Sequence, residues 1–311
     1  MLFSPHRWLR ISILNLLIVS VIGVILRYKI LYSLPFFDQK HLLHGHSHFA
    51  FAGWITQALM ALLVTYLCRQ NATIVFKKYE RLLIINLITA YGMLISFPIE
   101  GYGFFSILFS TLSIFVSYTF AIIYWKDLNR LPEKSISHYW FKAALIFNAI
   151  SSAGAFSLAI MMVTKTIHQN WYLAAIYFFL HFQYNGWFFF SCMGLLNEKI
   201  QPMISENNKL KTIFWFFAIA CIPAYFLSAL WLKIPIIIYI LVIVAALLQV
   251  FAWGWLVTLI KKNWLLIKQQ VPPTATWILA FSATALSIKL LLQLGSVIPA
   301  LSDLAFGFRP I

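Results

Sequence analysis

Four of the chain's eight histidines lie in one stretch, residues 41–48, at the start of a long apolar run. At about 100° per residue on a helix, His41, His44 and His48 fall within about 60° of one another, and His46 falls on the opposite side. Neutral imidazole is a common ligand of transition metals and haem iron, and polar groups inside a bilayer are costly unless paired or functional. The spacing therefore predicts that His44 and His48 face a cofactor. Hydrogen bonding at the outward-facing membrane interface is the preferred interpretation for His41 and His46.

A second candidate site surrounds a lone histidine, His181, in the middle of another apolar run. Tyr177, His181, Tyr184 and Asn185 fall on one helix face within about 100°. A histidine inside a bilayer is a functional candidate by default. We therefore expect His181 to bind a metal, with Tyr184 and Asn185 as catalytic residues beside it. The alternative is a hydrogen bond between helices that only satisfies the histidine.

A lysine also lies within an apolar run, where Lys289 and Gln293 are one helical turn apart. Snorkelling of the long side chain covers only part of the distance to the membrane surface. We expect Lys289 either to be structural or to bind a cofactor by pairing with an anion inside the bundle, such as a haem propionate.

The composition is that of a polytopic membrane protein, because 62% of the 311 residues are hydrophobic, 10% are charged and the mean hydropathy is +0.86. The net charge of +15 could suggest a nucleic-acid partner. The Lys and Arg residues lie in short loops between apolar runs, however, which makes them a signal of membrane topology and excludes nucleic acid. The three cysteines have neither C-x-x-C nor C-x-x-C-H spacing, so no disulfide framework or covalent haem site is indicated.

Apolar windows of about nineteen residues predict nine transmembrane helices. They lie near residues 10–32, 46–68, 82–98, 103–125, 140–164, 171–196, 212–232, 235–260 and 274–298. Sixteen Lys and Arg residues fall on one side of these spans and six on the other, which predicts a cytoplasmic amino terminus in a bacterial-type inner membrane. No internal repeat, low-complexity tract or long linker is apparent. We therefore expect one all-α membrane bundle over residues 1–311.

The first two spans resemble helices I and II of heme-copper oxidase subunit I, the superfamily of cytochrome oxidases and nitric oxide reductases. The resemblance rests on Arg27 at the end of the first span and on His44-Gly45 at the start of the second, before Phe49-x-Phe51. In that family, a histidine of helix II is an axial ligand of the low-spin haem. The resemblance thus implies that His44 ligates a haem, which we expect to be b-type. His48, one turn further along the helix, is the alternative ligand.

The sixth span is similar to the helix of that family that gives a histidine to the non-haem metal, copper or iron. The motif His181-x-x-x-Asn185-Gly186-Trp187 is nearest to the nitric oxide reductase form, with Asn185 in place of Glu. Two departures stand out. No histidine follows His181, so the family's paired histidines of helix VII are absent, and the chain ends after nine expected spans. We expect the sequence to be a fragment whose missing helices hold another haem ligand.

These observations favour a haem-binding, oxidase-like protein, a possible oxidoreductase, that takes part in respiratory electron transfer or in oxygen or nitric oxide chemistry. Its expected partners are the lipid bilayer, haem and other respiratory-complex subunits. A non-enzymatic haem- or copper-binding protein, or a nitric-oxide-tolerance factor, is the alternative. A transporter is the third class, disfavoured because neither an inverted repeat nor a pair of broken helices is apparent.

Overall fold

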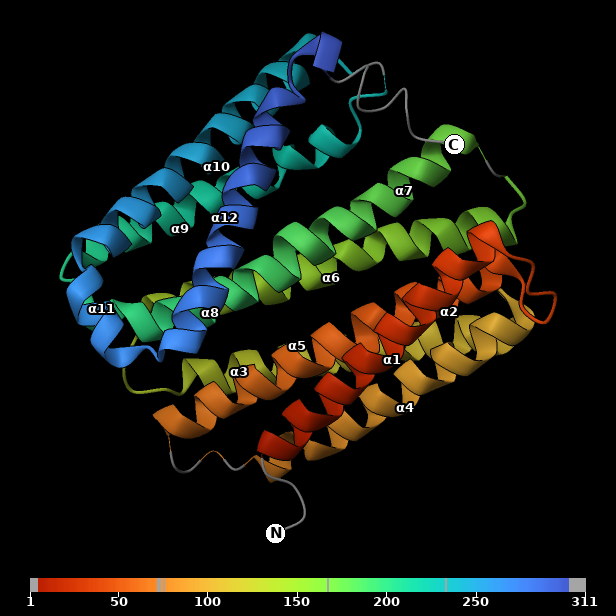
Figure 1. Cartoon of the computed structure of the whole chain (residues 1–311), viewed down its shortest axis with the longest axis horizontal. Coiled ribbons are helices and arrows are strands. Elements are labelled where there is room, and N and C mark those ends of the chain that lie inside the picture. Colours follow the sequence, from red (N-terminus) through yellow and green to blue (C-terminus); the bar gives the residue numbers. More distant parts are fainter. Residues whose placement is uncertain (1–4, 72–73, 75, 167, 233, 302–311) are drawn as a thin grey trace. The chain divides into compact units, whose positions relative to one another are not determined.

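The computed structural model describes residues 5–71, 74, 76–166, 168–232 and 234–301, and every regular element among these residues is a helix, without a strand. The chain divides into two compact units, Met1–Lys134 and Ser135–Ile311. Each is described by itself, with elements labelled as in Figure 1.

The first unit contains four helical rods, of which the second is interrupted. Its elements are α1 (Pro5–Leu31), α2 (Gln39–Phe49), the π-helical segment η1 (Ala50–Thr56), α3 (Gln57–Gln70), α4 (Lys77–Glu100) and α5 (Phe104–Asn129). Elements α2, η1 and α3 follow one another without a break, so they form one rod with a π-turn in its middle. Helix α4 packs on both α2 and α5, and α1 packs on the rod along α2, η1 and α3.

The second unit repeats this order of helices and then adds two more. Its elements are α6 (Ile136–Val163), α7 (Gln169–His181), the π-helical segment η2 (Phe182–Phe188), α8 (Phe189–Ile200), the short turn η3 (Gln201–Met203), α9 (Asn207–Cys221), the 3-10 segment η4 (Pro223–Ser228), α10 (Ile236–Lys262), α11 (Trp264–Gln270) and α12 (Pro273–Gly295). Elements α7, η2 and α8 again form one rod with a π-turn in its middle. Helix α6 packs on this rod, and α10 packs on α9, η4 and α12.

Seven described helices are long and apolar enough to cross a membrane, which identifies a multi-pass membrane protein. They are Pro5–Leu31, Gln39–Gln70, Lys77–Glu100, Phe104–Asn129, Ile136–Val163, Ile236–Lys262 and Pro273–Gly295. The other two expected spans, 171–196 and 212–232, coincide with α7–η2–α8 and with α9–η4. A π-turn interrupts the first, as another interrupts Gln39–Gln70, and a 3-10 segment beginning at Pro223 ends the second.

Local contacts position the start of helix α2, which carries the histidine cluster. The Asp38 side chain caps α2 by accepting a hydrogen bond from the His41 backbone N–H at 2.8 Å. Gly45 lets α2 approach α4 closely, because a Cβ there would lie 3.0 Å from Cδ of Pro98. Helix α4 ends at Gly101, whose φ of +61° favours glycine. Together these features hold the amino-terminal half of α2 against the end of α4.

Candidate functional site

The two π-turns carry the same sequence motif. His48-Phe49-x-Phe51-x-Gly53-Trp54 in the first unit matches His181-Phe182-x-Tyr184-x-Gly186-Trp187 in the second, each residue 133 positions after its counterpart. The π-helical segment begins two residues after His48 in the first unit and directly after His181 in the second. The expectation that the chain contains no internal repeat is therefore wrong. Because π-turns occur often at functional sites, the repeat marks both histidines as candidates.

An asparagine of the first helix anchors the π-turn in each unit, and these two asparagines are also 133 positions apart. In the first unit, Asn15 donates its amide N–H to the Gly53 carbonyl at 2.5 Å. Asn86 of α4 donates to the neighbouring Ala52 carbonyl at 3.0 Å. A π-turn disturbs the regular backbone hydrogen bonds of the helix, so these amides satisfy carbonyl groups that would otherwise be buried unpaired.

In the second unit, the corresponding asparagine contacts a side chain of the π-turn. Asn148 accepts a hydrogen bond from the Gln183 amide at 2.9 Å, and that amide also donates to the Ser151 hydroxyl at 2.7 Å. The carbonyl of Asn185, the counterpart of Ala52, faces the Cys221 thiol, whose Sγ lies 3.5 Å from it. Both π-turns are thus held by polar side chains of neighbouring helices within their own unit.

One ring nitrogen of His44 has a polar neighbour, and the other has none within the described part of the chain. Its Nδ1 lies 3.5 Å from the Tyr102 hydroxyl, and the two rings meet edge to face with centroids 4.6 Å apart. Its Nε2 is buried and has no hydrogen-bond partner within the described part of the chain. A metal-ligating histidine characteristically has its second ring nitrogen held by a polar neighbour while the first binds the metal. The geometry of His44 fits that role.

His48 lies one turn further along the same side of α2. Its ring stacks on Phe97 with centroids 4.3 Å apart, and it makes no hydrogen bond to any residue that the structure describes. The repeat places His48, not His44, in the position of His181. The motif therefore favours His48 as the functional histidine of the first unit, whereas the contact with Tyr102 favours His44.

The other two histidines of the cluster pack against backbone. His46 faces α1, because a Cβ on Gly23 would lie 3.3 Å from its Cε1 atom. The His41 ring lies against Gly101. The His41 backbone N–H holds the pKa of the Asp38 carboxyl, in the loop before α2, below its usual value. His46 also has a buried ring nitrogen, Nδ1, without a hydrogen-bond partner among the described residues, but its ring faces α1, whereas His44 and His48 share the side of α2 that faces α4.

His181 has hydrogen bonds at both ring nitrogens and is 3% exposed. Nε2 lies 2.8 Å from the Cys221 carbonyl and Nδ1 lies 3.1 Å from the Asn185 amide nitrogen. A neutral imidazole that donates from Nε2 and accepts at Nδ1 satisfies both contacts. A metal at His181 would have to displace one of these two bonds.

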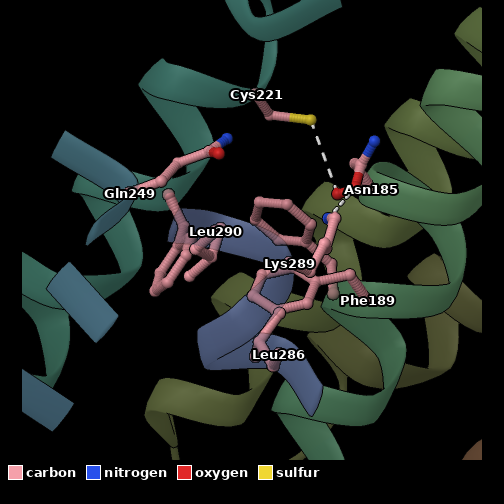
Figure 2. Close-up of a pocket in the computed structure, with 9 residues that line it drawn as sticks. Asn185, Phe189, Cys221, Gln249, Leu286, Lys289 and Leu290 are labelled. Carbon is pink, nitrogen blue, oxygen red and sulfur yellow. Dashed lines mark hydrogen bonds between the residues drawn. The ribbon is translucent and has the colours of Figure 1, made fainter. Parts of the chain in front are cut away.

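Lys289 of α12 completes this group by donating a hydrogen bond from Nζ to Oδ1 of Asn185 (Figure 2). The structure thus brings together three of the expected site residues of the second unit, His181, Asn185 and Lys289. It does not bring Tyr184 to them, because Tyr184 is 55% exposed and its ring contacts Phe188. The i→i+5 spacing of the π-turn rotates each residue less than an α-helix does, which moves Asn185 towards His181 and Tyr184 away from it.

Two residues beside this group, Cys221 and Gln249, have no role in the expected site. Both line a pocket together with Asn185 and Lys289 (Figure 2). Cys221 could not be found from its spacing, because it is distant in sequence and belongs to no motif. The repeated His-Phe-x-aromatic-x-Gly-Trp motif is the sequence signal that would have paired the two histidine sites.

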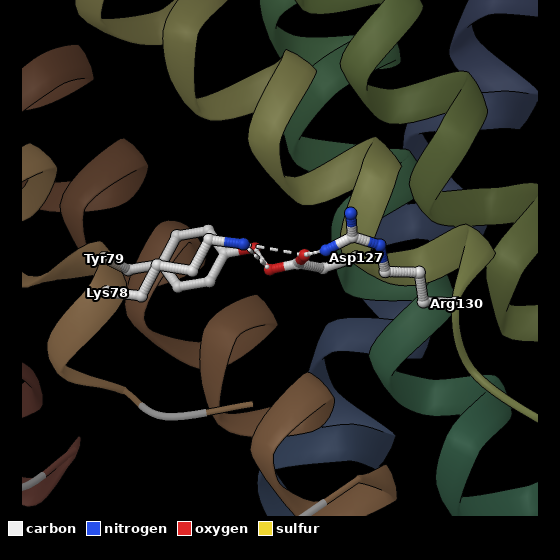
Figure 3. A network of polar contacts seen from close by, with 4 residues as sticks. All are labelled: Lys78, Tyr79, Asp127 and Arg130. Atoms are coloured by element: carbon white, nitrogen blue, oxygen red, sulfur yellow. Dashed lines mark hydrogen bonds and ion pairs between the residues drawn. The ribbon is translucent and has the colours of Figure 1, made fainter. Parts of the chain in front are cut away.

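A buried carboxylate forms a further polar cluster, in the first unit (Figure 3). Asp127 of α5 is 2% exposed and accepts hydrogen bonds from Lys78 at 2.6 Å and from the Tyr79 hydroxyl at 2.7 Å. Arg130 lies 3.5 Å from its other oxygen. Lys78, Tyr79 and Arg130 all contact the Asp127 carboxylate, so the cluster fastens the start of α4 to the end of α5.

Among the described residues, no three His, Cys, Asp or Glu side chains form a group that could hold a metal ion. The candidate sites are therefore individual histidines, His44 and His48 in α2 and His181 at the end of α7, in the two rods that contain the repeated π-turns. Comparison with known protein families, with curated proteins and with solved structures finds no match.

Proposed function

We propose that this membrane protein binds haem through His44 and takes part in electron transfer or in binding a diatomic gas such as oxygen or nitric oxide. The observation that carries the proposal is the buried, unpartnered Nε2 of His44, opposite an Nδ1 that faces Tyr102. The likeness of the first two spans to heme-copper oxidase subunit I supports it. A b-type haem would supply the redox-active, gas-binding iron.

The ring nitrogens of His44 are suited to binding haem iron. Leaving a buried ring nitrogen unpaired costs about 1–3 kcal/mol, and coordination to iron would remove that cost. If Nδ1 carries the proton it donates towards the Tyr102 oxygen, which leaves the Nε2 lone pair free for a metal. The Phe97 and Tyr102 rings beside His44 offer flat apolar contacts of the kind a porphyrin needs.

In the second unit, the proposal assigns a non-haem metal, copper or iron, to His181, with Asn185 as its hydrogen-bonding neighbour. Binding there requires that the Cys221 carbonyl or the Asn185 amide release a ring nitrogen. Tyr184 would have to turn from its exposed position to act at the same metal.

Purification tests the proposal. The protein, expressed with haem supplementation and extracted in detergent, should show a Soret band that is lost in His44→Ala and kept in His46→Ala, a matched change on the opposite side of the same helix. A Soret band lost in His48→Ala but kept in His44→Ala would move the ligand to the position indicated by the repeat. Unchanged haem in both variants would overturn the assignment. A haem-free protein that carries copper would support the non-enzymatic copper-binding alternative.

A transporter is a second candidate, which the repeat favours. Paired repeats with interrupted helices in corresponding positions are typical of membrane transporters, and the substrate sites lie at those interruptions. Here the interrupted rods Gln39–Gln70 and Gln169–Ile200 correspond. Proton flux measured with a pH-sensitive dye in liposomes containing haem-free protein tests this candidate. Flux that exceeds that of empty liposomes and is lost in Asn185→Leu would support transport.

A further inference from the structure

The second unit contains a pocket beside η2 that combines one cation with apolar walls (Figure 2). Its polar lining residues come from four elements and are Asn185, Cys221, Gln249 and Lys289. Three phenylalanines and two leucines form the rest of the lining. No Asp or Glu of the described residues lines it.

The cation is Lys289, which lies within the apolar helix α12. The residue is exposed on α12, but its Nζ turns inward to the Asn185 oxygen, and this is its one hydrogen bond to a described residue. Its ammonium group has three N–H donors, so two remain free. No described Asp or Glu forms an ion pair with it. A cation in a membrane-spanning segment is costly unless a partner neutralises it.

Gln249 of α10 is a second unsatisfied group at the same pocket. It is 7% exposed, yet its side chain makes no hydrogen bond to any residue in the described ranges. Its amide atoms are not among the fully buried unpaired ones, so a ligand in the pocket that this residue lines can reach them. Its NH2 group can donate two hydrogen bonds.

The remaining polar atoms of the pocket are already committed. The Asn185 side chain accepts from Lys289 and contacts His181, and the Cys221 thiol faces the Asn185 carbonyl. The ring edges of the phenylalanines carry partial positive charge. The groups left for a ligand are thus the N–H donors of Lys289 and the Gln249 amide, whose NH2 group donates and whose oxygen accepts, with an apolar wall around them.

We propose that this pocket binds a small monovalent anion of the size of chloride, held by Lys289 and Gln249. One negative charge neutralises the single cation, whereas a divalent anion would leave a net charge against apolar walls. The site lies in the second unit and needs no haem, so the test of this proposal is independent of the haem proposal.

Binding of radiolabelled chloride to the purified, detergent-solubilised protein tests the proposal. At constant ionic strength, with gluconate as the replacing anion, we expect saturable binding of about one chloride per chain. Lys289→Met should weaken it at least tenfold and Gln249→Leu several-fold, because each removes one donor group. Lys268→Met, which removes an exposed cation of α11 in the same unit, should leave it unchanged.

Lys289→Arg keeps the charge and should retain binding, which makes the test valid even if Lys289→Met fails to fold. Size-exclusion profiles identify variants that misfold. The proposal is overturned if the wild type shows no saturable chloride, if folded Lys289→Met binds like the wild type, or if Lys268→Met loses as much as Lys289→Met.

Discussion

Replacing Gly186 by alanine should destabilise the second unit, because Gly186 lets the π-turn η2 pack tightly against α6. A Cβ at this position would lie 2.5 Å from Cβ of Phe147, a distance that real Cβ atoms essentially never show. The Phe147 Cβ is fixed to the α6 backbone, so a change of rotamer cannot relieve the clash. Overpacking of this kind costs about 1–3 kcal/mol, and removing a helical glycine returns about 0.5–1 kcal/mol. We expect a net loss of up to about 2.5 kcal/mol.

Gly254→Ala is the matched control, since it changes the same atoms in helix α10, where nothing lies within 4 Å of the new Cβ. It should be neutral or slightly stabilising. Gly53→Ala, at the repeated position, should cost less than Gly186→Ala, because its Cβ would meet ring atoms of Phe49 at 2.6 Å and a ring can shift.

Apparent melting temperatures, measured by size-exclusion chromatography after heating in detergent, compare the three variants. At about 2–4 °C per kcal/mol for a protein of this size, Gly186→Ala should melt several degrees below Gly254→Ala. A Gly186→Ala protein as stable as Gly254→Ala would refute the close packing of η2 on α6.

Two further changes test other parts of the structure. Asp127→Asn should lower stability by about 1–3 kcal/mol in the same melting assay, because it removes the buried charge that Lys78 and Tyr79 contact. Glu206→Gln, which breaks an ion pair at the surface with Lys262, should have a much smaller effect. Equal losses of stability in the two variants would contradict the difference in burial between Asp127 and Glu206. The carboxylate of Asp38 has a lowered pKa in the folded protein, so its capping of α2 is complete at neutral pH and is lost as the pH falls below its usual value of 3.8. Hydrogen exchange at the start of α2 should therefore be faster in Asp38→Ala than in the wild type at neutral pH, and the difference should shrink in acid; a difference that grows in acid would show that another group caps the helix.

Hydropathy was sufficient to predict the helical, multi-pass membrane fold, because each long apolar run must satisfy its backbone hydrogen bonds internally. Helical spacing was sufficient to separate His46, which faces α1, from His44 and His48, which face α4. The second inference uses the regular α-helical period, which α2 keeps.

The candidate site was less predictable where the helix departs from it. A π-turn changes the angle between residues, so α-helical spacing placed Tyr184 beside His181, whereas the structure exposes it. Cys221 and Gln249 join Asn185 only through tertiary packing of α9 and α10, which no local pattern encodes. The repeat could have been found from sequence, since four identical residues of the two motifs and the two asparagines, Asn15 and Asn148, share one spacing.

The haem content of the purified protein tests the central proposal most directly. A pyridine haemochromogen assay on haem-supplemented wild type, His46→Ala and His44→Ala gives the number of haem groups per chain. The proposal predicts about one b-type haem in the first two proteins and almost none in the third, with all three eluting as folded protein. Wild-type protein without haem, or His44→Ala protein with a full complement, would contradict it.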